Sequence, residues 1–167
     1  MNINENKIEL VPFLDEDLEI FKKWLDKEHV YKWFYSEEEE KSYYLDEAYN
    51  ANVKNNPVKH FIVKSNSEKI GYCLYVDSHF QSEYSQEVYG EIFLEKYAYE
   101  INYFIGEEKY LNKGIGKIIV KKLEEKIIEI GGKEILADPD EENIISVKML
   151  LSGGFTKIKN GAYVKKL

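Results

Sequence analysis

The sequence contains little cysteine and no arginine, and each shortage excludes a class of function. Cys73 is the only cysteine among 167 residues, which excludes an intramolecular disulfide and any zinc site built on several thiolates. All 23 basic residues are lysines, and 31 acidic residues outnumber them to give a formal net charge of −8. General nucleic-acid binding is therefore disfavoured. The low use of cysteine suits a reducing, cytoplasmic environment.

Long apolar runs and clustered metal ligands are also missing. No run approaches the roughly 20 residues that span a bilayer, and residues 1–7 lack the basic-then-apolar order of a signal peptide. We therefore expect the protein to be neither exported nor membrane-spanning. His29, His60 and His79 lie far apart without the spacing of metal ligands, so we expect no metal site.

The chain has enough apolar residues for one packed core and too little length for two ordinary domains. With 44% hydrophobic residues, we expect a single domain over residues 1–167. The formal charge is −10 over residues 1–106 and +2 over residues 107–167. The acidic excess, which includes Glu37–Glu40, is either a solvated face or a set of loops that attract a cationic ligand. In the second case the more basic part would hold a phosphorylated ligand.

The order of predicted elements indicates a mixed α/β fold. Alternating and β-branched segments predict strands at residues 8–13, 61–64, 69–76, 97–106, 134–137, 155–157 and 163–165. Apolar residues spaced three and four apart predict helices over residues 15–27, 38–53, 114–130 and 143–151. Asp15 is the expected N-cap of the first helix, Asn160-Gly161 is the expected type I′ turn of a hairpin, and residues 79–96 form an expected irregular insertion.

A strand, a glycine-containing loop and a helix follow one another between Phe104 and Lys117. The first N–H groups of a helix have no intrahelical acceptor, and Gly114 and Gly116 would let a pyrophosphate approach the backbone. Lys113 or Lys117 would then lie near the phosphates. Glycine pairs also begin helices in folds that bind nothing there, so a simple strand-to-helix turn is the alternative. The segment has neither the third glycine of a dinucleotide fingerprint nor the Gly-Lys-Ser/Thr of a phosphate loop.

The blocks that carry a family resemblance are spread over nearly the whole chain. They are His29-Val30 through Trp33, Ile70-Gly71-Tyr72, Phe104-Ile105-Gly106-Glu107, Lys113-Gly114-Ile115-Gly116, and Asp138-Pro139 followed by Asn143 and Gly154-Phe155. In order and spacing they resemble the GNAT superfamily of acetyl-CoA-dependent N-acetyltransferases, and within it the aminoglycoside 6′-N-acetyltransferases. The pyrophosphate loop of that family starts with Gln or Arg, where this chain has Leu111.

The resemblance implies a fold, a co-substrate and a mechanism. The fold would be a central, mostly antiparallel sheet with helices on both faces, and acetyl would pass directly from acetyl-CoA to an amine without an acyl-enzyme. A strand at about residues 99–105 would offer its backbone to the pantetheine arm, and the loop 109–116 would hold the pyrophosphate. The cofactor-binding residues that it implies are Phe104, Ile105, Lys109, Lys113, Gly114, Ile115, Gly116, Lys117 and Asn143.

Two departures from the family pattern concern catalysis. Where the aminoglycoside enzymes have an Asp that contacts the reacting amine, this chain has Asn102, which cannot accept a proton. Strand alternation places Glu100 on the same face, so Glu100 is either the base or a solvated or ion-paired side chain. Leu150 stands where many members have a Tyr that protonates the departing thiolate. The thiol of CoA is acidic enough for such an acid to help without being indispensable.

Four further residues are expected on the substrate side. Trp33, Phe34 and Tyr44 match the aromatic substrate wall of the family, although aromatic residues more often form a core. Asp138 either lies beside the substrate or caps the turn that follows it.

Three functions are compatible with these residues. The first is N-acetylation of a polycationic small molecule, such as the 6′-amine of an aminoglycoside, which would confer antibiotic resistance. The second is acylation of another amine, in a siderophore intermediate, a polyamine or a peptide. The third is a catalytically weak acyl-CoA-binding module, which Asn102 and Leu150 favour.

Overall fold

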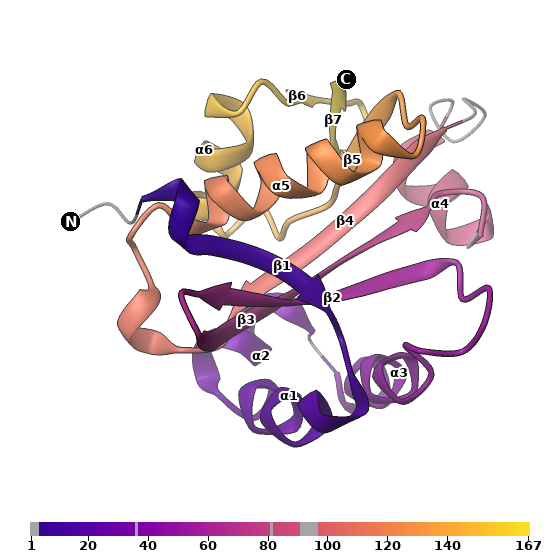
Figure 1. Cartoon of the computed structure of the whole chain (residues 1–167). Helices are drawn as coiled ribbons and strands as arrows, with labels where there is room; N and C mark the ends of the chain where they lie inside the picture. The colour runs from indigo at the N-terminus through magenta and orange to yellow at the C-terminus, as the bar shows by residue number, and fades with distance from the viewer. Residues whose placement is uncertain (1–3, 36, 81, 91–96) are drawn as a thin grey trace. The chain divides into compact units, whose positions relative to one another are not determined.

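The computed structural model describes residues 4–35, 37–80, 82–90 and 97–167 (Figure 1). Its helices are α1 Leu18–Leu25, α2 Glu28–Phe34, α3 Glu38–Tyr49, α4 Ser82–Tyr89, α5 Ile115–Glu129 and α6 Ile144–Ser152. Its strands are β1 Ile8–Pro12, β2 Val58–Ser65, β3 Glu68–Asp77, β4 Ala98–Ile105, β5 Glu134–Ala137, β6 Thr156–Lys157 and β7 Tyr163–Lys166. Across the described ranges, none of the helices has the length and apolarity needed to cross a membrane. The mixed α/β class is confirmed.

The strands follow the order β1-β2-β3-β4-β5-β7-β6 in one sheet. β1 pairs antiparallel with β2 over residues 8–12 and 61–65, and β7 pairs antiparallel with both β5 and β6. β4 and β5 are parallel, with Glu100 opposite Leu136. A parallel pair needs a long crossover, and α5 provides it. The mostly antiparallel sheet implied by the family resemblance is therefore confirmed.

The chain divides into two compact units. The first holds the residues up to Leu74 together with Tyr103–Ile119, and the second holds Tyr75–Asn102 together with Val120–Leu167. Helices α1, α2 and α3 belong to the first unit, and α4 and α6 belong to the second. Strands β3 and β4 and helix α5 contribute residues to both.

Aromatic rings form the core of the first unit. The ring of Phe21 lies 4.7 Å from that of Tyr72 and 6.0 Å from that of Phe104, and Phe13 meets Phe21 edge-on at 5.7 Å. Trp24 is fully buried and meets Phe104 edge-on. Phe21 and Trp24 are three residues apart, so both lie on the inner side of α1, as the apolar spacing predicts. Figure 1 shows α1, α2 and α3 lying together beside β1 and β2.

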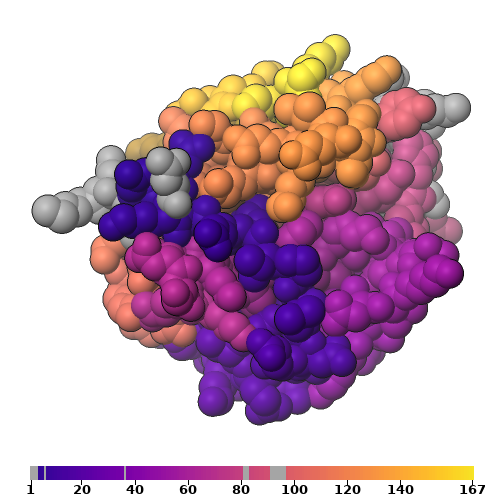
Figure 2. Space-filling view, in the orientation of Figure 1, coloured from indigo at the N-terminus to yellow at the C-terminus, as the bar shows by residue number. Residues whose placement is uncertain are grey.

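In the part of helix α5 that belongs to the second unit, the side chains of one face are buried and those of the other face are exposed to solvent. Leu123 and Ile127 are fully buried, whereas Lys121 and Glu125 are exposed. Figure 2 shows the outer face of this helix, drawn in orange, at the surface. The helix ends at the glycine pair 131–132, as predicted: Gly131 has a φ of 87° and the N–H of the next glycine donates to the Ile127 carbonyl at 2.8 Å.

The start of the first helix differs from the expectation. Asp15 is not its N-cap, because Asp15–Asp17 form a short 3₁₀ turn ahead of α1. Instead the carboxylate of Asp17 accepts the backbone N–H of Leu14 at 2.8 Å. Asp17 is 2% exposed and is ion-paired with Lys69. Three consecutive acidic residues give no sequence signal for which one is buried.

The expected irregular insertion over residues 79–96 contains a helix. α4 occupies Ser82–Tyr89, and residues 91–96 lie outside the described residues. The helical period is hard to recognise because one of the inward positions is a serine. Ser85 is 1% exposed and Tyr89, one turn later, is 2% exposed.

The last two strands form the predicted hairpin, but the predicted type I′ turn is wrong. The N–H of Ile158 donates to the Ala162 carbonyl at 2.8 Å, and the N–H of Gly161 donates to the Ile158 carbonyl at 3.0 Å. The connection therefore has three residues, and Gly161 takes a φ of 94°. This is the pattern of a type I turn followed by a left-handed glycine, which uses an Asn-Gly pair as readily as a two-residue turn does.

Candidate functional site

The loop before α5 has the backbone geometry of an anion site. Its φ angles are 58° at Asn112 and 77° at Gly114, a left-handed conformation that Gly adopts without strain. α5 begins at Ile115, and the first N–H groups of a helix have no intrahelical acceptor. A Cβ at Gly116 would stand 2.9 Å from the Tyr103 hydroxyl. Gly114 is therefore suited to the left-handed backbone of the loop, and Gly116 avoids the close contact that a side chain there would make with Tyr103.

The lysines around this loop make different contacts within the protein. Lys109 is ion-paired with Glu68 at 2.6 Å, and the same carboxylate accepts the Tyr110 hydroxyl at 2.8 Å. The hydrogen bonds from Lys109 and then Tyr110 lower the pKa of Glu68. Lys113 lies over the Tyr110 ring, 5.6 Å from its centroid, and Lys117 is exposed in the first turn of α5. A phosphate would therefore have to compete with Glu68 for Lys109.

The end of β4 is held by two basic side chains of the first unit. His29 donates from Nε2 to the Ile105 carbonyl at 2.9 Å, and Lys27 donates from Nζ to the Gly106 carbonyl at 2.8 Å. On the other side, the Ile70 carbonyl accepts the N–H of Gly106 at 2.8 Å. Both carbonyls at this strand end are therefore already hydrogen-bonded within the first unit.

Trp24 and Glu107 support the same strand end and were missed by sequence reasoning. The indole Nε1 of Trp24 donates to Glu107 at 2.7 Å, and this bond contributes most to the lowered pKa of that carboxyl. A Cβ at Gly106 would stand 2.3 Å from the Trp24 ring. The Gly106-Glu107 pair in the family block is the signal that could have identified this contact, because both residues serve the same tryptophan.

Two residues expected in the cofactor site have buried side chains. Phe104 is 6% exposed within the aromatic core, and Ile115 is 1% exposed at the start of α5. Only their backbone atoms can therefore take part in binding.

The expected aromatic wall is partly core. Phe34 is 8% exposed, and its ring lies 4.3 Å from that of Tyr44 and 4.7 Å from that of Phe104. Trp33 and Tyr44 are half-buried, and Lys32 lies over the Trp33 ring at 4.6 Å. The structure therefore gives Phe34 a packing role and leaves part of the Trp33 and Tyr44 rings exposed.

In the second unit, Glu100 is a half-buried carboxylate on β4. Burial raises its pKa from 4.5 to about 7, the Tyr89 hydroxyl acts against this rise, and the charge of Asp138 adds to it. Asp138 is exposed as a residue, and the partial burial of its carboxyl raises its pKa. Asp138 directly follows β5, whose Leu136 is opposite Glu100, and its charge acts on Glu100, so the two acids lie near each other. A carboxylate that titrates near neutrality is suited to general base catalysis.

The remaining expected residues also lie in the second unit. Asn102 is half-buried on β4, two residues after Glu100 and on the same face by alternation. Asn143 is the N-cap of α6, and its Oδ1 accepts the Ser146 N–H at 3.2 Å. Leu150 is 2% exposed, so the position at which many family members have a Tyr carries no hydroxyl here and serves the core.

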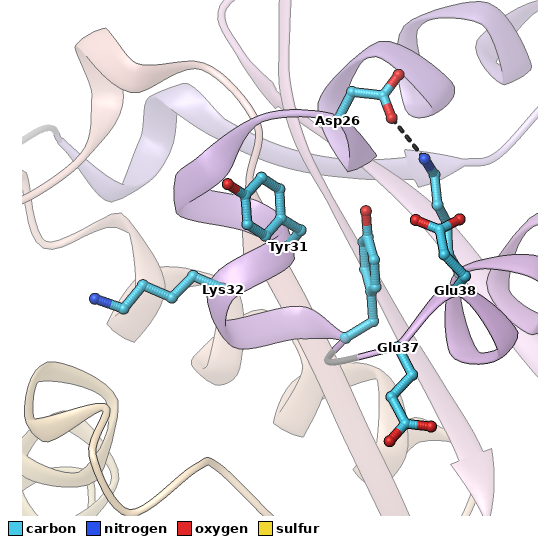
Figure 3. Close-up of a pocket in the computed structure, with 7 residues that line it drawn as sticks. Asp26, Tyr31, Lys32, Glu37 and Glu38 are labelled. Carbon is cyan, nitrogen blue, oxygen red and sulfur yellow. Dashed lines mark hydrogen bonds and ion pairs between the residues drawn. The ribbon is translucent and has the colours of Figure 1, made fainter.

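A pocket of about 470 Å³ lies elsewhere in the first unit, between the ends of α1 and α2 and the start of α3 (Figure 3). It is lined by Asp26, Tyr31, Lys32, Tyr35, Glu37, Glu38 and Lys41. Figure 3 shows Lys32 and Glu37 extending outward, while Lys41 is ion-paired with Asp26 at 2.7 Å. None of the expected catalytic, substrate-binding or cofactor-binding residues lines it, whereas Glu37 and Glu38 of the acidic run do. Among the described residues, no group of three or more His, Cys, Asp and Glu is arranged to hold a metal ion.

Comparison with known proteins supplies a family and a set of similar folds. The profile of the Acetyltransferase (GNAT) domain family matches residues 13–162. The structure of AAC(6')-Ib in complex with paromomycin and acetyl-CoA is similar, with a TM-score of 0.75, 19% identity, and coverage of 96% of this chain and 93% of that one. The aminoglycoside N(6')-acetyltransferase from Legionella pneumophila gives a TM-score of 0.73 at 17% identity, covering 100% of this chain and 93% of that one.

The fold is also shared with a protein that modifies another protein. RimL, a ribosomal L7/L12 alpha-N-protein acetyltransferase, gives a TM-score of 0.69 at 13% identity, with coverage of 96% of this chain and 91% of that one. Identities this low show a common fold, so they do not choose between a small molecule and a protein as substrate.

Proposed function

Because this chain belongs to the acetyltransferase (GNAT) domain family, we propose that it transfers acetyl from acetyl-CoA to an amine of a polycationic small molecule, such as an aminoglycoside 6′-amine. The observation that carries the proposal is Glu100, whose pKa of about 7 lets it take up and release a proton at neutral pH. Support for the substrate class comes from the aminoglycoside acetyltransferases that share the fold.

The loop before α5 suits the pyrophosphate of this co-substrate. Left-handed backbone at Asn112 and Gly114 leads directly into the N-terminus of α5, where unbonded N–H groups and the helix dipole favour an anion. Lys113 and Lys117 add positive charge at the same place. Bound acetyl-CoA supplies a thioester, whose carbonyl the amine attacks and whose thiolate leaves.

Glu100 is assigned the proton transfer. In its charged form it accepts one proton from the substrate ammonium, and the neutral amine that remains has the lone pair needed to form the amide bond. Asn102, on the same face, offers an amide oxygen that can accept a hydrogen bond from the ammonium but has no basic site. Leu150 supplies no acid, so once the amide bond has formed the second proton of the nitrogen passes through water to the departing thiolate, as a thiol pKa near 8.5 permits.

The charge of the chain favours a cationic substrate. Asp138 lies close enough to Glu100 for its charge to act on that carboxyl, and residues 1–106 carry a formal charge of −10. Acidic surfaces raise the local concentration of cations. In the first unit, the half-buried rings of Trp33 and Tyr44 keep area on which a sugar ring can stack.

A second candidate is a catalytically weak acyl-CoA-binding module, favoured by the core position of Leu150 and by Asn102. The two are separated by following thiol release from acetyl-CoA with kanamycin, spermine or a peptide with a free N-terminus, alongside calorimetry with CoA. The proposal expects the fastest release with kanamycin. Release with spermine alone would keep a polycationic amine as the substrate but exclude the aminoglycoside, and release with the peptide alone would support another class of amine. CoA binding without release from any amine would identify the module.

A further inference from the structure

Tyr89, the last residue of α4, buries a hydroxyl that the reaction described above does not use. The residue is 2% exposed, and its hydroxyl makes no hydrogen bond of ordinary geometry with the described residues, although it lies close enough to Glu100 to lower the pKa of that carboxyl. Its ring belongs to a buried cluster with Ala98, Leu136 and Ala162. A buried hydroxyl without a partner is unfavourable and uncommon, so it requires an explanation.

The cluster and the strand register together place Tyr89 on the face of the sheet that carries Glu100. Ala98 and Glu100 are two residues apart on β4, so they lie on the same face, and Leu136 is opposite Glu100 on β5. Tyr89 therefore covers the side of the sheet on which the Glu100 carboxylate lies. Burial raises the pKa of Tyr89 well above its usual value, and the ionisable groups that add to this rise are, in order, Glu100, Tyr84 and Asp138.

We propose that Tyr89 is a positioning residue for Glu100: its hydroxyl donates to one carboxylate oxygen, which leaves the other oxygen to receive the proton of the amine. A tyrosine hydroxyl has one proton to donate, and a carboxylate is its strongest common acceptor. Tyr89 keeps its proton throughout, so the proton count of the transfer is unchanged. This inference deepens the proposed function, because it rests on the role of Glu100 as the base.

The hydrogen bond should lower the pKa of Glu100, because it stabilises the charged carboxylate. Among the groups that act on Glu100, Tyr89 opposes the rise caused by burial and by Asp138. Tyr89 would therefore keep the buried carboxylate able to ionise near pH 7. Removal of the hydroxyl should leave Glu100 protonated over more of the neutral range.

The first test measures this proton directly and needs no substrate. Glutamate labelled at the side-chain carboxyl carbon is titrated by NMR in the wild type and in Tyr89→Phe, and Glu100 is assigned from the signal that Glu100→Gln removes. We expect Tyr89→Phe to raise the pKa of Glu100 by about one pH unit. The matched control, Tyr84→Phe, changes a tyrosine of the same helix that is 41% exposed and should leave that pKa unchanged. An identical Glu100 titration in wild type and Tyr89→Phe would overturn the proposal.

The second test uses turnover. In Tyr89→Phe, the rise of kcat/KM with pH should move to higher pH while the KM for acetyl-CoA stays constant. In a Glu100→Gln background, Tyr89→Phe should have no further effect, because the group that it positions is gone. Additive losses in the double variant would contradict a positioning role and would mean that the hydroxyl contacts the substrate directly. If no amine is acetylated, the proposed function fails, whereas the NMR titration still decides the pairing.

Discussion

At the residue scale, Glu100 shows how a local environment changes the chemistry of a common side chain. An ordinary glutamate is fully ionised at pH 7 and is a weak base. Burial on β4 and the neighbouring charge of Asp138 raise the pKa of Glu100 to about 7, so the carboxylate both accepts and releases a proton near neutrality. The same residue type at an exposed position would carry the charge without the reactivity.

Glu100→Gln keeps the shape of the side chain and removes its basicity. We expect kcat to fall by roughly 10²–10⁴-fold, the range for a positioned acid or base, with the affinity for acetyl-CoA nearly intact. The rise of kcat/KM through about pH 7 should disappear as well, because the charged form of Glu100 is the active one. Steady-state kinetics between pH 5.5 and 8.5 measure both. Glu129→Gln, at an exposed position on α5, is the control, and full activity in Glu100→Gln would refute the assignment.

His60 shows how a pKa that is shifted by burial also affects the stability of the fold. Its side chain is buried, Nδ1 lies 2.6 Å from the Tyr72 hydroxyl, and Nε2 lies 3.7 Å from the Glu47 carboxylate. Burial lowers the pKa of His60 to about 4, and burial likewise raises the pKa of Glu47. The folded state therefore holds the neutral imidazole, whereas the unfolded chain protonates it near its usual pKa of 6.5. Protonation below pH 6.5 consequently favours unfolding, and this effect grows until the pH reaches about 4.

From this linkage we expect His60 to cost about 2 kcal/mol of unfolding free energy between pH 7.5 and pH 5. Glu100 acts in the opposite direction over this range, because its raised pKa makes the folded state bind the extra proton. The wild type must therefore be compared with His60→Gln, which removes only the imidazole titration. Urea unfolding at the two pH values should show the wild type losing about 2 kcal/mol relative to this variant. The exposed His79→Asn should behave like the wild type, and an equal pH response in His60→Gln would refute the account.

At the element scale, the turn into α5 is the feature on which cofactor binding depends. Gly114 has a φ of 77°, which a β-branched residue adopts only with strain. We expect Gly114→Val to weaken CoA binding by at least tenfold, because the strained loop can no longer present its N–H groups to the pyrophosphate. Calorimetry measures the affinity, and circular dichroism verifies folding. Gly131→Ala is the control, since it changes a left-handed glycine at the other end of α5 where a Cβ meets nothing within 4 Å. Unchanged CoA affinity in folded Gly114→Val would show that the loop does not hold phosphate.

Helices α1 and α5, whose buried residues follow an apolar period, could be predicted from the sequence, whereas α4 could not. Leu123 and Ile127 lie four residues apart on α5, and Phe21 and Trp24 lie three apart on α1, so both helices are visible in the spacing. The inward side of α4 instead uses Ser85 and Tyr89. A serine in such a position removes the hydrophobic signal while the helix still packs.

The features of the candidate site also divide into those that could be predicted from the sequence and those that could not. Alternation along β4 predicts that Glu100 and Asn102 share a face, because strand geometry depends on local sequence alone. The raised pKa of Glu100 could not be predicted, since it arises from burial and from Asp138, a residue distant in sequence. Trp24 was also missed, because its bond to Glu107 joins residues 83 positions apart. Local sequence patterns predict which face of an element a residue occupies, whereas the fold determines which distant residues lie next to it.

At the scale of the whole molecule, the boundary between the acidic and the more basic parts of the sequence does not coincide with the boundary between the two compact units. The formal charge is −10 over residues 1–106, yet β3, β4 and α5 each contribute to both compact units. The loop assigned to phosphate lies in the more basic part of the sequence, and Glu100 lies in the more acidic part. A chain of this kind can attract an anionic co-substrate and a cationic amine without a large local field of either sign.

The central claim, direct acetyl transfer to the amine of a polycation, is tested most directly by tandem mass spectrometry of kanamycin after incubation with the protein and acetyl-CoA. The account predicts a product that carries one acetyl group on the 6′-amine, formed by the wild type and strongly reduced with Glu100→Gln. Unmodified kanamycin, from a protein that binds CoA in the same buffer, would contradict it.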